Sequence, residues 1–462
     1  MGAATGDEAF MAGVIPGAAA PLGTGSEAGG KDGAAAYRPA LTLLASLFFT
    51  WGFITVINNT LLSHLRNVFD LTYTQTTLIE SVWFIAYFVA SLPAARLIAR
   101  VGYQRALVVG LGIMAVGTLG MVAAARFPSY NITLASLFVI ACGITLLQVA
   151  ANPYVAVVGP PESASARLNL VQAFNSLGTT LAPLFGGYLI LGRSTSGNVA
   201  GDAASLSAVE RLADAQAVQL PYLIVTATLV VLAIVIARAS LPAMGPERAT
   251  ASRVARAERA SHPLWRHRNL VFGVPAIFIY LIAEIGVSNL FINFVSQPAI
   301  GDLTHAEASH YLFLLWGGMM VGRFAGAWVM RRAPAETVLA GAAIGACAVM
   351  LVTSFATGPL AMWSLISVGL FHAIMFPTIF TLGIRDLGPL TERGSGLLIM
   401  AIAGGALVVV QGWIADRYGL QHSFLLTAAC ELYVLFYAVW GCRTTAPAED
   451  AAISLVGGTA TS

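Results

Sequence analysis

Long apolar runs alternate with short polar segments along most of the chain. A helix that crosses a bilayer needs about 20 largely apolar residues, and twelve runs reach that length. These runs cover residues 41–62, 76–98, 106–125, 133–157, 168–191, 219–240, 270–296, 309–330, 336–355, 360–385, 395–414 and 422–442. The pattern therefore predicts an all-α membrane protein with twelve transmembrane helices.

The longest basic connection, residues 241–268, divides the spans six plus six. The second and eighth spans both end in basic clusters, at 95–105 and 322–332, and the fourth and tenth both carry a late proline, Pro153 and Pro377. We expect two parallel six-helix repeats with a binding site between them at the midplane. The predicted units are a disordered cytoplasmic tail over 1–37, a bundle over 38–240, a basic cytoplasmic linker over 241–268, a second bundle over 269–443 and a cytoplasmic tail over 444–462.

The basic residues predict the orientation of these helices. With the N-terminus in the cytoplasm, most of the 24 lysines and arginines fall in cytoplasmic segments or at cytoplasmic helix ends. Arg323, in the basic cluster at 322–332, is counted among the helix ends. Because cytoplasmic loops of membrane proteins carry an excess of Lys and Arg, we expect both termini in the cytoplasm.

Composition excludes the soluble classes of protein. The 462 residues are 57% hydrophobic and 10% charged, whereas soluble domains carry about 25% charged residues. A net charge of +2 gives no basis for a nucleic-acid partner. The four cysteines have neither metal-ligand spacing nor the pattern of a disulfide framework. Since we find no nucleotide-binding or hydrolase motif, we expect neither an enzyme nor a resident cofactor or metal.

Amide side chains lie inside two neighbouring apolar runs between residues 143 and 187. Gln148 and Asn152 share one helix face, and Gln172 and Asn175 share another. Amides at membrane depth are costly unless they pair within the protein or line a wet cavity. Because an amide both donates and accepts hydrogen bonds, such a cavity suits a ligand rich in hydroxyl groups, such as a sugar. The alternative is that these amides hold helices together without binding a ligand.

The seventh span carries a second set of polar residues. Glu284 and Ser288 share one face of this helix, and Asn289 and Asn293 share another. We expect one of these two stripes to face the amides of the fourth and fifth spans across the cavity. Four aromatic residues are candidates to stack on a sugar ring, namely Trp51, Phe53, Trp316 and Phe371.

Several segments carry a family resemblance, namely LFFTWGFITVINNTLLSHL, LLQVAANPYVAVVGPPESASARLNLVQAFNSLGTTLAPLFG, MFPTIFTLGIRDLG and GSGLLIMAIAGGA. Together they closely resemble the fucose–galactose–glucose:proton symporter family of the major facilitator superfamily, over about residues 41–442. The QVAANPYV segment is more similar to the bacterial glucose/galactose transporters than to the fucose permeases. The resemblance implies the major facilitator fold and a multi-pass importer of monosaccharides in the bacterial inner membrane, working by alternating access and coupled to protons.

The chain departs from the fucose permeases at two acidic positions. Those permeases carry an aspartate where this chain has Asn59, in the pair Asn58-Asn59, and a glutamate where it has Gln148. We place both asparagines, Gln148 and His372 in the predicted sugar site; His372 stands where the family usually has an asparagine. Neither Asn59 nor Gln148 titrates, so a coupling proton needs another carrier. The acidic candidates inside the spans are Glu284, which is the first choice, Glu80 and Glu431.

Three interpretations of the function remain open. The first is a glucose/galactose-type hexose importer coupled to protons. Because Asn59 and Gln148 are neutral, the second is a sugar facilitator or a sodium-coupled transporter. The third is an efflux pump or a non-transporting sugar sensor. An efflux pump fits less well because the predicted cavity is rich in amides, and a sensor fits less well because the longest loop is short. The expected partners are the sugar and the lipid bilayer; the repeats need no partner to form a core, so we expect a monomer.

Overall fold

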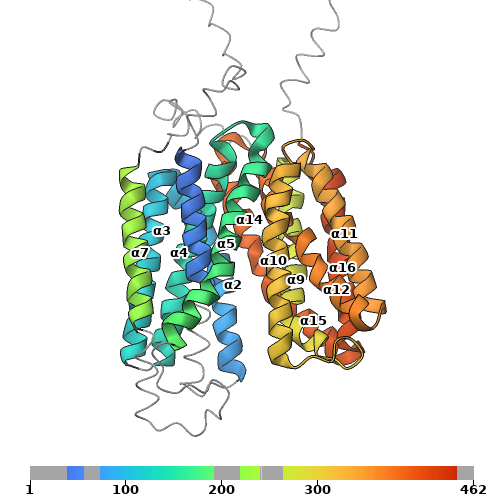
Figure 1. The fold of residues 1–462 in the computed structure, drawn as a ribbon. Coiled ribbons are helices and arrows are strands. Elements are labelled where there is room, and N and C mark those ends of the chain that lie inside the picture. The colour runs from blue at the N-terminus through green and yellow to red at the C-terminus, as the bar shows by residue number, and fades with distance from the viewer. Residues whose placement is uncertain are drawn as a thin grey trace, which may run out of the picture.

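The computed structural model describes residues 39–56, 73–127, 129–191, 219–239, 241 and 264–444. All regular structure in these ranges is helical, and the helices form two groups that stand side by side (Figure 1). The first group consists of a first helix, Pro39–Val56, followed by α2 (Tyr73–Val101), α3 (Tyr103–Arg126), α4 (Tyr130–Val157), α5 (Ala164–Leu191) and α7 (Gln219–Arg238). We call this group the N-half.

The second group, the C-half, begins with the short turn η3 (Leu264–Arg266). Its helices are α9 (Arg268–Val295), α10 (His305–Val329), α11 (Ala335–Phe355), α12 (Gly358–His372) with α13 (Met375–Ile384), α14 (Thr391–Met400) with α15 (Val408–Tyr418), and α16 (Leu420–Phe436) with η6 (Tyr437–Gly441). Within the described residues, eleven helical segments are long and apolar enough to cross a membrane. Helix α5, with 28 residues, is a further long helix in the N-half. The prediction of twelve spans in two six-helix groups is confirmed.

Burial separates inner from outer helices. The most apolar window of α4 is 67% buried, whereas that of α7 is 33% buried. The exposed residues of α7 include Val230, Val231 and Val235, which suits a helix that faces lipid. The polar stripe of α4 therefore lies inside the protein, where only other protein groups or a ligand can satisfy it.

A proline explains why the tenth span is broken. Pro377 has no N–H, and its ring would meet the carbonyl of Ala373 in a continuous helix. Helix α12 ends at His372, and α13 begins at Met375. The free carbonyl of Ala373 accepts a hydrogen bond of 3.1 Å from Nε of Arg323 on α10. The break thus turns a backbone acceptor toward a neighbouring helix.

The fourth span contains the equivalent proline without a break. Pro153 lies inside α4 and leaves the carbonyl of Val149 without its usual backbone donor. The hydroxyl of Ser395 on α14 donates to that carbonyl at 3.1 Å. Since α14 belongs to the C-half, this proline provides an anchor between the two halves.

The two halves pack closely at one end of the bundle. We call this end, which is uppermost in Figure 1, the terminal side, because the first helix begins there. Here α10 and α13 pack against α5, and α14 packs against α2 and α4 (Figure 1). Side-chain hydrogen bonds that cross between the halves in this region include Ser165 to Thr381 at 2.6 Å, Asn169 to Thr378 at 3.1 Å, and Ser395 to the Val149 carbonyl at 3.1 Å.

Candidate functional site

Three amides of the N-half form a connected group, which we call the amide cluster (Gln148, Asn152 and Gln172). The Nε2 of Gln148 donates to the hydroxyl of Tyr87 on α2 at 2.5 Å. The Nε2 of Gln172 on α5 lies 3.5 Å from Oδ1 of Asn152 on α4. All three amides are buried. The structure therefore brings together the stripes of α4 and α5 that the sequence predicted as neighbours.

Asn152 is the least satisfied member of the amide cluster. Its side chain is fully buried, and its Nδ2 has no hydrogen-bond partner among the described residues. An unsatisfied buried donor costs about 1–3 kcal/mol. A hydroxyl group bound beside Asn152 would accept from this donor and remove that cost.

Asn175, predicted on the same stripe as Gln172, has a different role. Its Nδ2 donates to the carbonyl of Phe48 on the first helix at 2.9 Å. The first helix and α5 cross closely here, because a Cβ at Gly52 would lie 2.3 Å from the Asn175 carbonyl oxygen, and one at Gly178 would lie 2.2 Å from the Phe49 carbonyl oxygen. At least one donor of Asn175 holds this crossing together.

Arg323 lies deeper than its place in the sequence suggests. We expected it at a helix end in the cytoplasm, but it lies within the spanning part of α10, His310–Val329. The guanidinium donates to Ser176 Oγ and, at 3.4 Å, to the Gln172 carbonyl, both on α5. A count of basic residues misses such a case, because the five donors of an arginine can be satisfied by backbone carbonyls instead of water. The only signal in the sequence is the apolar character of the flanking residues.

Glu284 on α9 lies near Arg323. The carboxylate of Glu284 interacts electrostatically with the guanidinium of Arg323 and with the hydroxyl of Tyr280, one turn earlier on the same helix. The stripe of α9 that contains Glu284 therefore faces the N-half by way of Arg323. The hydroxyl of Ser288 donates to the Glu284 carbonyl at 3.0 Å, within its own helix.

The other predicted residues of the seventh span point elsewhere. Asn289 and Asn293 are both exposed, so they form a separate face of α9. Asn58 and Asn59 lie outside the described residues. Glu80 lies in α2, but its side chain is outside the described part of the structure. The predicted roles of these five residues in sugar binding or proton coupling stay predictions.

His372 and Glu431 form a pair inside the C-half. The Nε2 of His372 lies 2.9 Å from Oε1 of Glu431 on α16, and the two side chains are 2% and 0% exposed. The hydroxyl of Tyr280 donates to the backbone carbonyl of His372 at 2.9 Å. The imidazole thus has a carboxylate partner inside the C-half. The sequence marked both residues as titratable but contained no signal that they meet.

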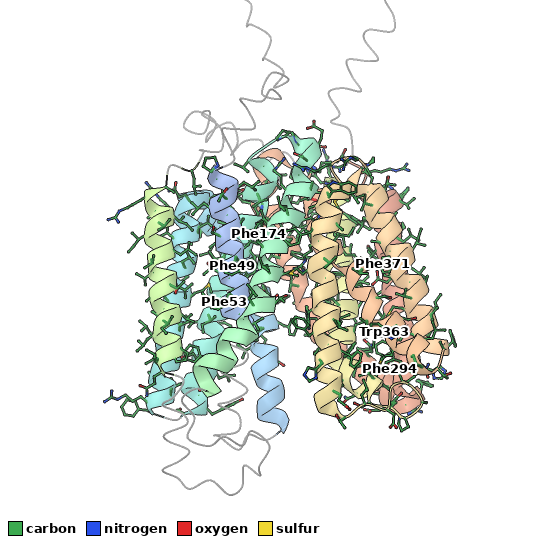
Figure 2. All side chains as sticks on the ribbon, in the orientation of Figure 1. Phe49, Phe53, Phe174, Phe294, Trp363 and Phe371 are labelled. Atoms are coloured by element: carbon green, nitrogen blue, oxygen red, sulfur yellow. The ribbon has the colours of Figure 1, made fainter. Side chains whose placement is uncertain are left out.

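The candidate aromatic residues mostly pack within their own half. Trp51 lies against Phe48 with ring centroids 5.2 Å apart. Figure 2 shows Phe53 close to Phe49 on the first helix, and Phe371 among the helices of the C-half. Trp316 is 39% exposed on α10. None of these contacts places a ring against the amide cluster.

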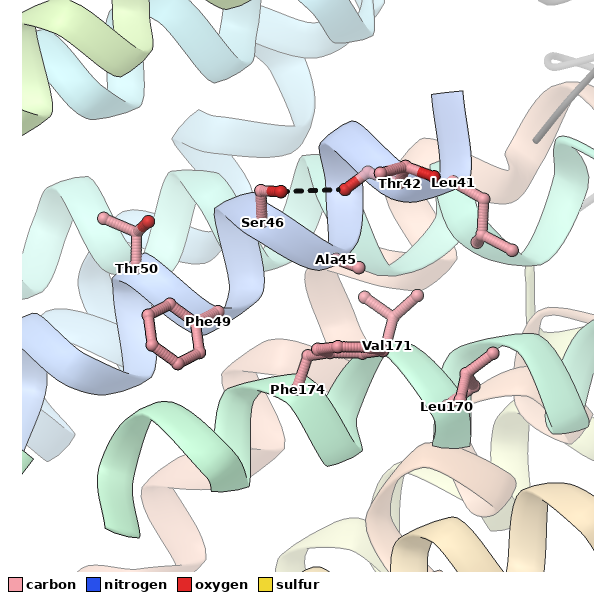
Figure 3. A pocket seen from close by; sticks show the side chains of 9 residues that line it. All are labelled: Leu41, Thr42, Ala45, Ser46, Phe49, Thr50, Leu170, Val171 and Phe174. Atoms are coloured by element: carbon pink, nitrogen blue, oxygen red, sulfur yellow. Dashed lines mark hydrogen bonds between the residues drawn. The ribbon is translucent and has the colours of Figure 1, made fainter. Parts of the chain in front are cut away.

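A pocket of about 320 Å³ lies between the first helix and α5 (Figure 3). Its wall is apolar apart from three hydroxyls, and one of these, Ser46 Oγ, donates to the Thr42 carbonyl of its own helix at 3.0 Å. Thr42 and Ser46 are exposed, so the pocket opens on the outer surface of the bundle. The members of the amide cluster are not among the residues that line it, and we assign the candidate site to the cluster.

Metal chemistry has no support in the described part of the chain. No group of three or more His, Cys, Asp or Glu side chains is arranged there to hold a metal ion. The four cysteines, which all lie in that part, are free thiols.

The chain is similar to known transporters over most of its length. The sequence profile of the Major Facilitator Superfamily matches residues 43–408. A glucose/galactose transporter of Brucella abortus is 44% identical over 409 residues, which is 88% of this chain and 95% of that protein. The L-fucose-proton symporter of Escherichia coli is 32% identical over 88% of this chain and 94% of that protein.

The fold is also similar to a solved structure. The structure of the transporter FucP in the outward conformation superimposes with a TM-score of 0.78 at 32% identity. The matched region covers 88% of this chain and 100% of that one.

Proposed function

Because the chain belongs to the Major Facilitator Superfamily, we propose that it imports a hexose of the glucose/galactose type across the bacterial inner membrane by alternating access. The observation that carries the proposal is the fully buried Nδ2 of Asn152 within the amide cluster, which has no hydrogen-bond partner among the described residues. Similarity to a glucose/galactose transporter at 44% identity supports the same class of substrate. Transport of a sugar requires no covalent step, which agrees with a site built from amides.

Sugar recognition would rest on hydrogen bonds from side chains of both halves. Asn152 and Gln172 offer donors and acceptors from the N-half, and Gln148 extends this surface toward Tyr87. Glu284 would approach the sugar from the C-half, because Arg323 joins its surroundings to α5. A ligand held by two halves stabilises the conformation in which both can reach it, and this is how binding would drive alternating access.

The orientation proposed for the helices assigns the two ends of the bundle to the two sides of the membrane. The basic residues support cytoplasmic termini, so the terminal side would be the cytoplasmic side. The contacts between α5 and α10 and between α14 and α2 would then close the cytoplasmic side. This arrangement suits an outward-facing state, and a state open to the cytoplasm would require these contacts to separate.

We further propose that uptake is coupled to protons and that a monomer suffices. Similarity to an L-fucose-proton symporter supports the proton as coupling ion. The candidates to carry it are Glu284, Glu80 and Glu431. Since Asn59 and Gln148 are neutral, a facilitator or a sodium-coupled transporter is the alternative.

Uptake of labelled glucose into proteoliposomes, with galactose and fucose as competitors, tests this function. We expect accumulation above equilibrium only when an inward proton gradient is imposed. Equilibration that does not depend on the gradient would indicate a facilitator. Accumulation that requires sodium would indicate that sodium is the coupling ion in place of the proton. Absence of uptake and exchange for all three sugars would overturn the proposed substrate class.

A further inference from the structure

The pair of His372 and Glu431, which we call the buried pair, has a feature that packing does not explain. One carboxylate oxygen of Glu431 bonds the imidazole, while Oε2 is buried without a partner among the described residues. An uncompensated charge at this depth is very costly. The buried pair is electrically neutral as a whole only while it holds one proton between the imidazole and the carboxylate.

Glu284 differs from Glu431 in its counter-charge. The guanidinium of Arg323 lies near Glu284 and stays charged under all relevant conditions. The carboxylate of Glu284 therefore has a nearby counter-charge that needs no added proton. The charge of Glu431 is compensated by His372, and this compensation exists only while the buried pair is protonated. Of the two acids, only Glu431 has a partner whose own positive charge requires a proton.

A continuous series of contacts joins the buried pair to the amide cluster. The residue after His372 is Ala373, whose carbonyl accepts from Nε of Arg323 at 3.1 Å. The same guanidinium donates to the carbonyl of Gln172, whose side chain bonds Asn152. The buried pair and the sugar site therefore lie at two ends of one hydrogen-bonded route that passes through the break in the tenth span.

Opening of the terminal side would disturb this route. Arg323 bonds α5 of the N-half and the break between α12 and α13 of the C-half at the same time. When α5 and α10 separate, the guanidinium loses its partners on α5. The break at Ala373 can then shift and admit water to His372, because Pro377 leaves this part of the helix without its regular hydrogen bond.

We propose that the buried pair carries the coupling proton of sugar transport, and that Arg323 is the positioning residue through which sugar at Gln172 controls its release. The inference rests on the proposed proton-coupled sugar uptake and assigns the proton to Glu431 and His372 in place of Glu284. The proton is held in the state described here and is released to water when the terminal side opens. No bond other than that to this proton forms or breaks.

The surroundings of the buried pair contain few other titratable groups. Tyr280 of α9, Cys347 of α11 and Cys430 of α16 interact electrostatically with Glu431. Glu284 and Arg323 also interact electrostatically with Tyr280, and Arg323 bonds the carbonyl of Ala373, next to His372. Tyrosine and cysteine are neutral near pH 7 unless strongly perturbed, so among these groups only the imidazole of His372 can supply a positive charge to Glu431.

Separate assays of accumulation and exchange test the assignment. In proteoliposomes, the variants Glu431→Gln and His372→Gln should exchange labelled sugar in counterflow but should no longer accumulate it under a proton gradient. The inside-to-outside ratio should fall to unity. The double variant His372→Gln/Glu431→Gln should behave alike, because two amides restore the hydrogen bond without a proton to release.

Two further variants serve as controls. Thr427→Val removes a fully buried hydroxyl one turn before Glu431 that has no partner among the described residues. This variant should accumulate sugar as the wild type does. Glu284→Gln should lower exchange and accumulation together, because it removes the counter-charge of Arg323 and disturbs the site itself.

The outcomes separate this inference from the proposed function. If the wild type accumulates sugar and Glu431→Gln does so equally, the assignment of the proton is wrong and the function stands. Selective loss of accumulation in Glu284→Gln alone would show that Glu284, and not the buried pair, carries the coupling proton. If the wild type neither takes up nor exchanges any of the three sugars, the function itself fails.

Calorimetry of wild-type protein needs no variant. Sugar binding measured in two buffers of different ionisation enthalpy gives the number of protons exchanged on binding. We expect a non-zero number between pH 5 and 8, because we infer that sugar at Gln172 controls the proton of the buried pair. Sugar binding without any proton exchange across that range would overturn the inference.

Discussion

At the residue scale, the partner of a polar side chain decides what it does. Asn152 and Asn175 both occupy predicted amide stripes, and both lie inside the N-half. Asn175 donates to the carbonyl of Phe48 and holds a helix crossing. Asn152 lies in a fully buried position, and its Nδ2 has no partner in the part of the chain that the structure describes. The two asparagines should therefore respond differently to removal of the amide.

We expect Asn152→Ala and Gln172→Ala to weaken sugar binding, with KM for uptake raised about tenfold, which corresponds to about 1.4 kcal/mol for one lost hydrogen-bonding group. Asn175→Ala should chiefly lower the melting temperature, since it loosens the crossing of the first helix and α5. Uptake kinetics and thermal unfolding in detergent measure the two effects.

Thr145→Val is the matched control for the amide cluster. Its hydroxyl lies on the same stripe of α4 but donates to the Ala141 carbonyl of its own helix at 2.8 Å. It should leave KM unchanged. Wild-type uptake in both Asn152→Ala and Gln172→Ala would show that the sugar binds elsewhere.

At the element scale, prolines and glycines shape the contacts between helices. Pro153 and Pro377 each free one backbone carbonyl, and a side chain from another helix satisfies each of them. Glycines act differently, by allowing two helices to approach. A Cβ at Gly404 would lie 2.1 Å from the backbone oxygen of Phe278, whereas one at Gly317 would meet no atom within 4 Å.

These two glycines allow a direct test of close packing. Gly404→Ala should lower the melting temperature, because overpacking against a backbone costs about 1–3 kcal/mol. Gly317→Ala should leave stability unchanged or raise it by about 0.5–1 kcal/mol, because alanine restricts the unfolded chain and favours helix. Equal melting temperatures for the two variants would contradict the close approach of η5 (Ala401–Leu407) and α9.

At the scale of the whole molecule, transport depends on how the halves separate. The hydroxyls of Ser165 and Thr381 lie 2.6 Å apart across the interface of the halves on the terminal side. The hydroxyls of Thr118 and Thr226 lie 2.8 Å apart between α3 and α7, within the N-half. Rocking of one half against the other changes the first distance and preserves the second.

Disulfides at these two positions should have opposite effects on transport. In a background without the four native cysteines, Ser165→Cys/Thr381→Cys should form a disulfide that stops uptake, and a reductant should restore it. Thr118→Cys/Thr226→Cys should also cross-link but should leave uptake intact. Full uptake with the first pair cross-linked would contradict opening of the terminal side during transport.

Much of the site was predictable as a set of residue types but not as a set of contacts. The stripes of α4 and α5 follow from helical spacing, and they meet at Gln172 and Asn152 as expected. Arg323 was placed at a helix end because it precedes two further arginines in the chain. Its three acceptors belong to α5 and to the break at Ala373, and no local pattern contains that information.

The sequence by itself determined the twelve spans, their division into two halves and the resemblance to sugar transporters. Span length and hydropathy depend on about 20 consecutive residues, so they can be read locally. The tertiary structure alone decided the pairing of polar groups. Glu431 meets His372 across 59 positions, and Arg323 meets Gln172 across 151. In an apolar interior each polar group must find such a partner, and only the packed fold determines which one is within reach.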